Sequence, residues 1–544
     1  MTLGPRAQTW LATLLFAALT TFMTWPQAAH LVTHAHGHYD VYFNMWRLAW
    51  IAHALTTAPS RLFAGNIFFP EPRTLTYSDA MLVEGAIGTP LLIAGVPPVL
   101  THNLLLLGAI VSSATGIFVL ARHLTRSAAA GVIAGVIFAF VPYRFEHFMH
   151  MEMQWTMWMP WALWSLHRTF ETERWKYGAL TGMFLSLQML SSIYYGVFLA
   201  ILLGLIAGLL LLPRVWTPLT TLRALFPALS IGAVVAILCC GLYALPYLAT
   251  KDKVGGRVPA EMNQYSARPS SYLVATPGSI LYGKAFAGRS RPERRLFPGT
   301  LAVILAIVGL FRKEASPIPI AYLLSMVAAF ELSLGLTGYS FAFLLTHFSA
   351  FEGFRALARL GVFVVLFLAV LAAYGYSALM ENRGSLTRRI VFVAVTAVLL
   401  MEYRVQPMPL DAYPNSAPQL YAWLAQQPRG VVAEFPMPRL DGWPGPDARV
   451  SYLSTFHWQP MLNGYSGFMP PSYATRLDAV MYFPDERALN RLRRDRVRYL
   501  IVHTDAYRTD EVVVILDALK NRYGFPELGR FSDGSGEAVV FEAR

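Results

Sequence analysis

Long apolar runs alternate with short polar loops through the first 402 residues of the chain. About 20 apolar residues in a helix cross the roughly 30 Å of hydrocarbon in a bilayer, and a helix satisfies its own backbone hydrogen bonds there. The pattern predicts eleven membrane-spanning helices, at residues 8–28, 101–121, 128–142, 153–167, 177–192, 194–212, 226–248, 298–311, 317–335, 358–377 and 389–402. A further apolar segment, residues 81–98, is interpreted as a partly inserted or membrane-surface helix, because counting it as a span breaks the pattern of basic residues in the loops.

Basic residues cluster on alternate loops between these segments, which is the pattern that the positive-inside rule gives for a cytoplasmic N-terminus. An odd number of spans then places the C-terminus outside. Residues 29–98, residues 249–297 and the tail from Tyr403 are therefore expected to share the outer face. The clusters are Arg6; Arg122 and Arg126; Arg168, Arg174 and Lys176; Arg214 and Arg223; Arg312 and Lys313; and Arg383, Arg388 and Arg389.

The pattern changes from Tyr403 onward. Residues 430–436 (GVVAEFP) and 497–503 (VRYLIVH) are typical of buried strands, ALNRLRRDR predicts a helix, and residues 537–542 predict a closing strand. The predicted fold class is thus an α-helical polytopic membrane protein with about 11 transmembrane helices. It divides into a membrane domain, 1–402, with outer loops 29–98 and 249–297, and an extracytoplasmic α/β domain, 403–544.

The chain is 55% hydrophobic and 14% charged, with a formal net charge of +12. From Tyr403 onward there are 16 basic and 16 acidic residues, so all the positive excess lies in the membrane half. This location favours a role in topology and in contact with anionic membrane lipid, and it argues against nucleic acid as a partner. The sequence has no Walker loop and no HExxH motif, which argues against ATP-driven transport and zinc proteolysis.

Aspartate occurs only three times in the membrane half, at Asp40, Asp79 and Asp252. Asp40 begins a helical pattern in which Phe43, Trp46 and Trp50 share an apolar face, with Arg47 and His53 leaving it, so we expect this helix to lie on the bilayer surface. Two interpretations of Asp40 stay open: a helix N-cap and a catalytic base.

Four histidines, His30, His34, His36 and His38, precede Asp40. In an extended strand the last three would lie on one side, where a divalent metal is conceivable. The spacing matches no established ligand signature, and we expect neither a metal nor a cofactor.

Asp79 and Glu84 follow in the same outer loop. Either could be a second catalytic carboxylate, while Glu84 could equally stabilise the first turn of the apolar helix that it begins.

Cationic side chains lie at two other outer turns. Arg144, His147 and His150 recur at helical spacing in YRFEHFMHMEMQW, and Arg355 and Arg359 lie four residues apart. We expect these five to bind a phosphate through charge-assisted hydrogen bonds. The alternatives are pairing of Arg144 with Glu146, snorkelling to the headgroups and topological anchoring. The 249–297 loop adds six arginines against the positive-inside trend, and binding of an anionic ligand is one reason to tolerate them. They are Arg257, Arg268, Arg289, Arg291, Arg294 and Arg295.

The order of these parts resembles the GT-C superfamily of integral membrane glycosyltransferases: a first span, an outer loop with an aspartate beside an aromatic helix, many spans and an outer C-terminal domain. HYDVYFNMWRLAWIAHAL, PYRFEHFMHMEMQWTMWMPWALWSLHR, LFPGTLAVILAIVGL, FEGFRALARLGVFVVLFLAVLAAYG and PMLNGYSGFMPPSY resemble bacterial members, and together they touch most of the chain.

The resemblance implies an enzyme of the bacterial inner membrane that moves a sugar from a polyprenyl-phosphate donor to a glycan, lipid or protein acceptor outside. It also implies that Asp40 is the acid–base residue, although Tyr39 and Val41 replace the adjacent acidic pair seen in some families. Two other interpretations remain: a transporter or lipid-linked glycan flippase, for which Glu331 inside a span is a candidate, and a noncatalytic glycan-assembly protein.

Overall fold

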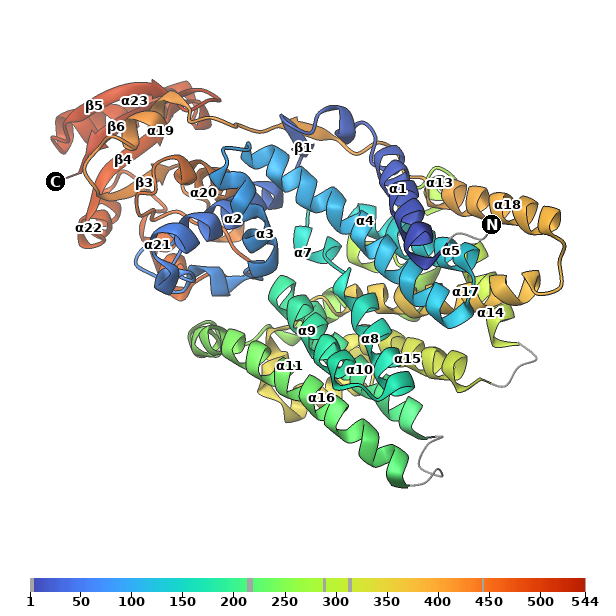
Figure 1. Cartoon of the computed structure of the whole chain (residues 1–544). Helices are drawn as coiled ribbons and strands as arrows, with labels where there is room; N and C mark the ends of the chain where they lie inside the picture. Colours follow the sequence, from blue (N-terminus) through green and yellow to red (C-terminus); the bar gives the residue numbers. More distant parts are fainter. Residues whose placement is uncertain (1–3, 213–218, 287–289, 312–315, 443–444, 544) are drawn as a thin grey trace. The chain divides into compact units, whose positions relative to one another are not determined.

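The structure is a computed structural model that describes residues 4–212, 219–286, 290–311, 316–442 and 445–543. It is mostly α-helical, with six strands among the described residues (Figure 1). Arg214, Arg289, Arg312 and Lys313 lie outside the described residues.

Each of the eleven predicted spans overlaps a helix of the structure, but the span predicted at 153–167 is interrupted, because the helix there begins only at Trp158. The helices are α1 (Pro5–Met23), α4 (Pro98–Thr125), α5 (Ala128–Phe140), α8 (Trp158–Thr172), α9 (Trp175–Ser191), α10 (Ile193–Leu211), α11 (Leu219–Val254), α14 (Thr300–Leu310), α15 (Pro317–Ser333), α17 (Gly361–Met380) and α18 (Ser385–Tyr403).

Five helical segments among the described residues are long and apolar enough to cross a membrane, so the chain is a multi-pass membrane protein. They are Pro98–Thr125, Ala128–Glu146, Ile193–Leu211, Arg223–Val254 and Leu357–Met380. The exact number of spans stays a prediction. The segment predicted to be only partly inserted contains α3 (Leu82–Ile93), one of the shorter apolar helices, with 12 residues.

The chain forms two compact units, which are described separately. The helical unit contains Met1–Ala29, Leu105–Ala244 and Gly255–Met408; the sheet unit contains His30–Leu104, Leu245–Val254 and Pro409–Arg544. The polar loop that carries Asp40 thus belongs to the same unit as the C-terminal region. The division into domains 1–402 and 403–544 stays a prediction.

In the helical unit α17 is buried along most of its length, from Gly361 to Tyr376, and packs against α5, α14 and α15. Gly309 and Gly375 bring the backbones of α14 and α17 together, since a methyl group at Gly375 would overlap the carbonyl oxygen of Leu305. Close approach at small residues is the usual way in which membrane helices gain contact area. By contrast, α11 exposes a row of large apolar side chains, including Ile237 and Leu242, which suits contact with lipid.

Shorter elements of the helical unit connect these helices and carry several polar side chains. They are α6 (Pro142–Glu146), α7 (Met151–Gln154), α12 (Pro259–Gln264), η5 (Pro269–Leu273), α13 (Gly283–Phe286), η6 (Pro292–Arg294), α16 (Ser340–His347), η8 (Ser349–Gly353) and η9 (Leu357–Leu360).

In the sheet unit, α2 (Tyr39–Thr57) packs against α3 and α20 (Asp447–Leu453). Most of α2 is buried, including Phe43, Trp46, Trp50 and Arg47. The prediction that α2 lies on the bilayer surface with Arg47 leaving it is therefore wrong. Phe43, Trp46 and Trp50 face protein, and their side chains form part of the core of this unit.

A four-stranded sheet closes the sheet unit, in the order β3-β4-β6-β5. β3 (Val431–Phe435) and β4 (Val497–His503) are parallel, while β6 (Glu537–Glu542) is antiparallel to both β4 and β5 (Glu527–Ser532). The predicted strands at 430–436, 497–503 and 537–542 are confirmed, and β5 was not predicted. A two-stranded pair joins β1 (His34–His36) to β2 (Leu410–Ala412).

Helices cover both faces of the four-stranded sheet, and Figure 1 labels several of them around it. Val431, Ala433 and Phe435 point with Leu500 and Val502 into a core shared with α22 (Glu486–Arg494) and α23 (Thr509–Asp517). The alternate residues of β3 and β4 face α19 (Gln419–Leu424), because successive side chains of a strand point to opposite faces. α21 (Pro471–Ala479) precedes α22. α22 contains most of the segment ALNRLRRDR, so the helix predicted there is confirmed.

Replacing Gly375 with alanine is expected to destabilise the helical unit, because the added methyl group forces α17 away from the carbonyl oxygen of Leu305. We expect a loss of about 1–3 kcal/mol, measured as a lower unfolding temperature of the purified protein in detergent. Gly204→Ala in α10, where nothing lies within 4 Å of the new methyl group, is the matched control and should not lose stability. Equal stability of the two variants would contradict the close approach of α14 and α17.

Candidate active site

Asp40 lies one residue inside α2, in its first turn. The capping side chain is that of His38, whose Nδ1 accepts the backbone N–H of Asp40 at 3.1 Å. The interpretation of Asp40 as the N-cap is therefore wrong. His38 therefore caps the helix, and Asp40 lies in the first turn, near the positive end of the helix dipole.

The Asp40 carboxylate contacts a tyrosine 425 positions further along the chain. The hydroxyl of Tyr465 donates a hydrogen bond to Oδ1 of Asp40 at 2.8 Å, and Nδ1 of His38 lies 3.3 Å from Oδ2. Tyr465 is buried, and its ring packs against Phe43 with the ring centroids 5.3 Å apart. The Asp40 side chain keeps 19% of its surface exposed. A carboxylate that is oriented from one side and open to solvent on another is suited to accept a proton from a bound molecule.

Asn44 and Arg47 share the helix face of Asp40, since their spacings are four and seven residues. Arg47 is buried, and its guanidinium donates to the backbone oxygen of Asp79 at 2.6 Å and to the side-chain oxygen of Asn44 at 2.5 Å. On the other side, the hydroxyl of Tyr247 accepts the N–H of Ala80 at 3.0 Å. The loop that carries Asp79 is thereby fixed against α2, the helix that carries Asp40.

Glu84 lies in the first turn of α3 and is fully buried. The prediction of a first-turn position is confirmed, and the helix N-terminus stabilises a carboxylate there. The catalytic roles of Asp79 and Glu84 stay predictions.

The histidines before Asp40 do not share one strand. β1 ends at His36, and His38 instead caps α2. The expectation of three imidazoles on one side of a strand is therefore wrong. Among the residues that the structure describes, no group of three or more His, Cys, Asp or Glu side chains could hold a metal ion.

The predicted phosphate-binding residues belong to the helical unit. Arg144 is buried, and its guanidinium donates to Oε1 and the backbone oxygen of Gln154, at 3.2 and 2.7 Å, and to the hydroxyl of Thr156 at 2.9 Å. Glu146 accepts from Arg295 and Thr276 instead of from Arg144. The alternative of local pairing between Arg144 and Glu146 is therefore wrong. Arg144 holds the turn between α6 and α8 together.

Arg359 and His147 meet at a shared carboxylate, that of Glu293. Nη2 of Arg359 lies 3.1 Å from Oε1 of Glu293, and Nε2 of His147 lies 3.4 Å from Oε2. Burial by itself raises the pKa of Glu293, but its interactions with Arg359 and then with His147 and His150 outweigh burial and lower it to about 2. Burial lowers the pKa of His147 to about 4, so Arg359 is the partner that carries charge at neutral pH. Glu293 therefore stays ionised at neutral pH and balances the charge of Arg359. His150 stacks on His147 with the ring centroids 5.7 Å apart.

Arg355 lies before η9 and not on one helix with Arg359, because α17 begins only at Gly361. Their separation of four residues therefore does not place the two arginines on one face of a helix. Nη1 of Arg355 lies 3.1 Å from Oε1 of Glu261, which also lies 3.5 Å from Nη1 of Arg257. The Arg355 side chain is 39% exposed, so it remains accessible to a ligand. The phosphate-binding roles of all five cationic residues stay predictions.

Glu331, the candidate for a transporter role, accepts the backbone N–H groups of Tyr339 and Ser340 at the start of α16. Its carboxylate thus satisfies the donors at a helix N-terminus. This is a structural role inside the helical unit.

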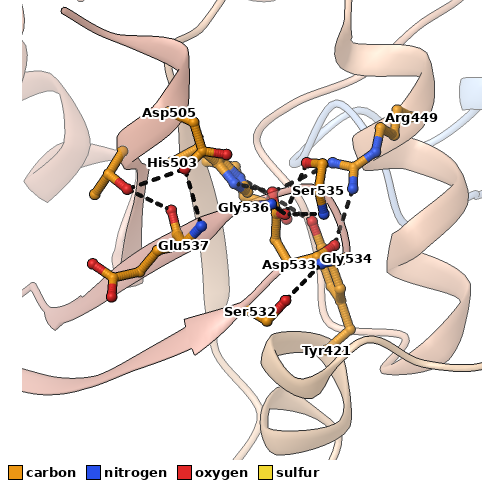
Figure 2. Close-up of polar contacts among 12 residues, drawn as sticks. Tyr421, Arg449, His503, Asp505, Ser532, Asp533, Gly534, Ser535, Gly536 and Glu537 are labelled. Atoms are coloured by element: carbon orange, nitrogen blue, oxygen red, sulfur yellow. Dashed lines mark hydrogen bonds and ion pairs between the residues drawn. The ribbon is translucent and has the colours of Figure 1, made fainter.

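A second polar cluster lies at the carboxyl ends of β3 and β4, and no motif of the sequence pointed to it. Figure 2 shows His503, Asp533, Arg449 and Tyr421 gathered there. Nδ1 of His503 lies 2.7 Å from Oδ2 of Asp533, and Nε2 lies 2.7 Å from Oε2 of Glu434. Burial by itself lowers the pKa of His503, but the two carboxylates outweigh it and raise the pKa to about 9. The imidazolium therefore donates on both sides and ties β3, β4 and the β5–β6 turn together.

No protein-family model matches the sequence, and a search of curated proteins finds no match. Solved structures share its fold. The arabinofuranosyltransferase AftD from mycobacteria is similar over 100% of this chain and 42% of its own, with a TM-score of 0.56 and 17% identity. ArnT from Cupriavidus metallidurans, bound to undecaprenyl phosphate, is similar over 99% of both chains, with a TM-score of 0.50 and 12% identity.

The chain thus spans less than half of the length of AftD and nearly all of the length of ArnT. Both are GT-C proteins, and the expectation of a GT-C fold is confirmed. At 17% and 12% sequence identity, the similarity to AftD and ArnT establishes the fold alone.

Alkaline pH is expected to destabilise the sheet unit through His503. Its pKa of about 9 in the folded chain exceeds the ordinary value of 6.5, so its stabilising contribution is complete below pH 6.5 and is lost as the pH rises through 9. The contribution is at most roughly 3 kcal/mol. The unfolding temperature of the parent protein should fall over this pH range, while that of His503→Gln should start lower and fall less. Parallel curves for the two proteins would contradict the assignment.

Proposed function

We propose that the chain is a membrane glycosyltransferase that moves a sugar from a polyprenyl-phosphate donor to a glycan, lipid or protein acceptor outside the membrane. The observation that carries the proposal is the carboxylate of Asp40 at the start of α2, held by Tyr465 and partly open to solvent. A GT-C fold over the whole chain supports it, and so does the binding of undecaprenyl phosphate by ArnT, whose length this chain matches.

In the proposed reaction Asp40 acts as the general base. Its carboxylate accepts the proton of an acceptor hydroxyl while that oxygen attacks the anomeric carbon of the sugar. The bond from the anomeric carbon to the phosphate oxygen breaks, and polyprenyl phosphate leaves with the electron pair. Attack from the side opposite the phosphate inverts the anomeric centre.

The leaving phosphate gains negative charge, which fixed cations stabilise. Arg355 is our first candidate among the predicted cations because its side chain is exposed. Arg359 and His147 are assigned a supporting role, since Glu293 already balances the charge of Arg359. Arg144 is assigned to holding its turn in place.

Asp40→Asn is the direct test of the base, because asparagine is nearly the same size but cannot accept the proton at neutral pH. We expect the transfer rate to fall at least about 100-fold. Cells lacking the protein are complemented with parent or variant, and the polyprenyl-phosphate-linked sugar that accumulates is measured by mass spectrometry of the lipid extract. The variant should leave the donor accumulated, whereas the parent should clear it.

Asp478→Asn is the matched control, since Asp478 is an exposed carboxylate of the same unit that pairs with Arg487 on the surface. It should clear the donor as the parent does. Clearance by Asp40→Asn at the parent rate, at equal protein abundance, would rule out Asp40 as the base.

Tyr465 is proposed as a positioning residue that acts through Asp40. Tyr465→Phe removes the hydroxyl that donates to Oδ1 of Asp40 but keeps the ring that packs on Phe43. A hydrogen bond to a charged group is worth about 1.5–3 kcal/mol, so we expect kcat to fall roughly 10- to 100-fold with little change in KM. Tyr482→Phe, at an exposed tyrosine of the same unit, should leave kcat unchanged. A rise in KM with kcat unchanged would assign Tyr465 to acceptor binding instead.

A further inference from the structure

A second basic site lies in the helical unit, and the residues that line it are not among those assigned to sugar transfer. A cavity of about 260 Å³ opens between η5 and η6, in the outer loop that the sequence marked for its excess of arginines. Its polar lining consists of Arg268, Ser270, Ser271, Ser290, Arg291 and Arg294. No acidic residue lines this cavity among the residues that the structure describes.

The walls of the cavity are fixed by hydrogen bonds that do not involve its basic groups. The backbone N–H of Leu296 donates to the oxygen of Ser271 at 3.0 Å, and that of Phe297 donates to the oxygen of Val274 at 3.2 Å. The oxygen of Ser290 accepts from Arg295, which is itself anchored on Glu146. The two segments that carry the arginines are thus held side by side before any ligand arrives.

Arg294 is the anchored member of the three arginines. Its Nε donates to the oxygen of Ser266 at 2.8 Å, and its Nη2 donates to the oxygen of Asn263 at 2.7 Å. Burial and then the positive charges of Arg268 and Arg291 lower the pKa of Arg294, because like charges disfavour one another. The guanidinium group of Arg294 is therefore repelled by those of Arg268 and Arg291.

Among the described residues, no carboxylate lines this cavity to balance the positive charge of its arginines. None of the three arginines forms an ion pair there, although Glu293 lies in the same segment. The carboxylate of Glu293 is buried and is committed to Arg359 and His147. A cluster of like charges that repel each other costs stability unless an anion joins it.

We propose that this cavity, lined by Arg268, Arg291 and Arg294, is a binding site for a phosphate group, separate from the donor phosphate of the proposed reaction. Guanidinium groups bind phosphate oxygens in pairs of parallel hydrogen bonds, and the hydroxyl of Ser270 adds a further donor. In the predicted topology this loop faces outside, where basic residues are otherwise disfavoured. The phosphate belongs to an anionic phospholipid headgroup or to a soluble phosphorylated compound.

The test uses the full chain in neutral detergent with two probes, phosphatidylglycerol and inorganic pyrophosphate. Arg268→Gln with Arg291→Gln removes two exposed charges and keeps most of each side chain, while Arg294 stays to anchor the loop. Arg508→Gln with Arg522→Gln, at exposed arginines of the sheet unit, removes the same charge elsewhere and is the matched control. Native mass spectrometry compares retained phosphatidylglycerol with phosphatidylcholine, and calorimetry measures the pyrophosphate affinity.

We expect the cavity variant to lose about tenfold in the binding of at least one probe, while the control variant matches the parent. Loss of selective phosphatidylglycerol retention identifies a lipid headgroup, and loss of pyrophosphate affinity identifies a soluble phosphate. Both results support the site. Unchanged binding of both probes, or equal losses in the cavity and control variants, would overturn it. Neither measurement depends on sugar transfer, so the outcome is independent of the proposed enzyme activity.

Discussion

A charged side chain that leaves water must find a partner, and this requirement arranges the polar groups of both compact units. Glu293 sits between Arg359 and His147, Glu331 caps the N-terminus of α16, and His503 lies between two carboxylates. Each such group would cost several kcal/mol if it were buried alone. In each case the partner comes from a different element, so satisfying the charge also fixes how the elements pack.

The same requirement separates groups that hold the fold from groups that remain open to a ligand. Arg144 has its guanidinium committed to Gln154 and Thr156, and it serves the turn in which it lies. The carboxylate of Asp40, in contrast, is oriented by Tyr465 but is still partly exposed. The arginines of the η5–η6 cavity have charge without a described counterion. A buried and balanced charge builds structure, whereas an exposed charge that is held in place can bind or react.

The surroundings of Asp40 are assembled from segments about 400 residues apart. β1 pairs with β2, Asn66 donates to Ser454, and the backbone of Phe68 and Phe69 bonds to Asn463 and Met461. These contacts carry Tyr465 to the start of α2. The first polar loop therefore owes its conformation to the C-terminal region, which explains why α2 is buried in protein although its aromatic pattern is typical of a helix on a membrane surface.

The sequence by itself determined the apolar helices, the strands β3, β4 and β6 and the scarcity of aspartate that singled out Asp40. These features follow from hydrophobic periodicity and residue counts, which act locally along the chain. It did not determine that His38 caps α2, that Arg359 lies on Glu293 rather than beside Arg355, or that Tyr465 contacts Asp40. Only the tertiary structure decided these contacts, because the partner of a polar side chain is whichever group the fold brings within hydrogen-bond distance. The spacing of residues along the chain does not reveal which group that is.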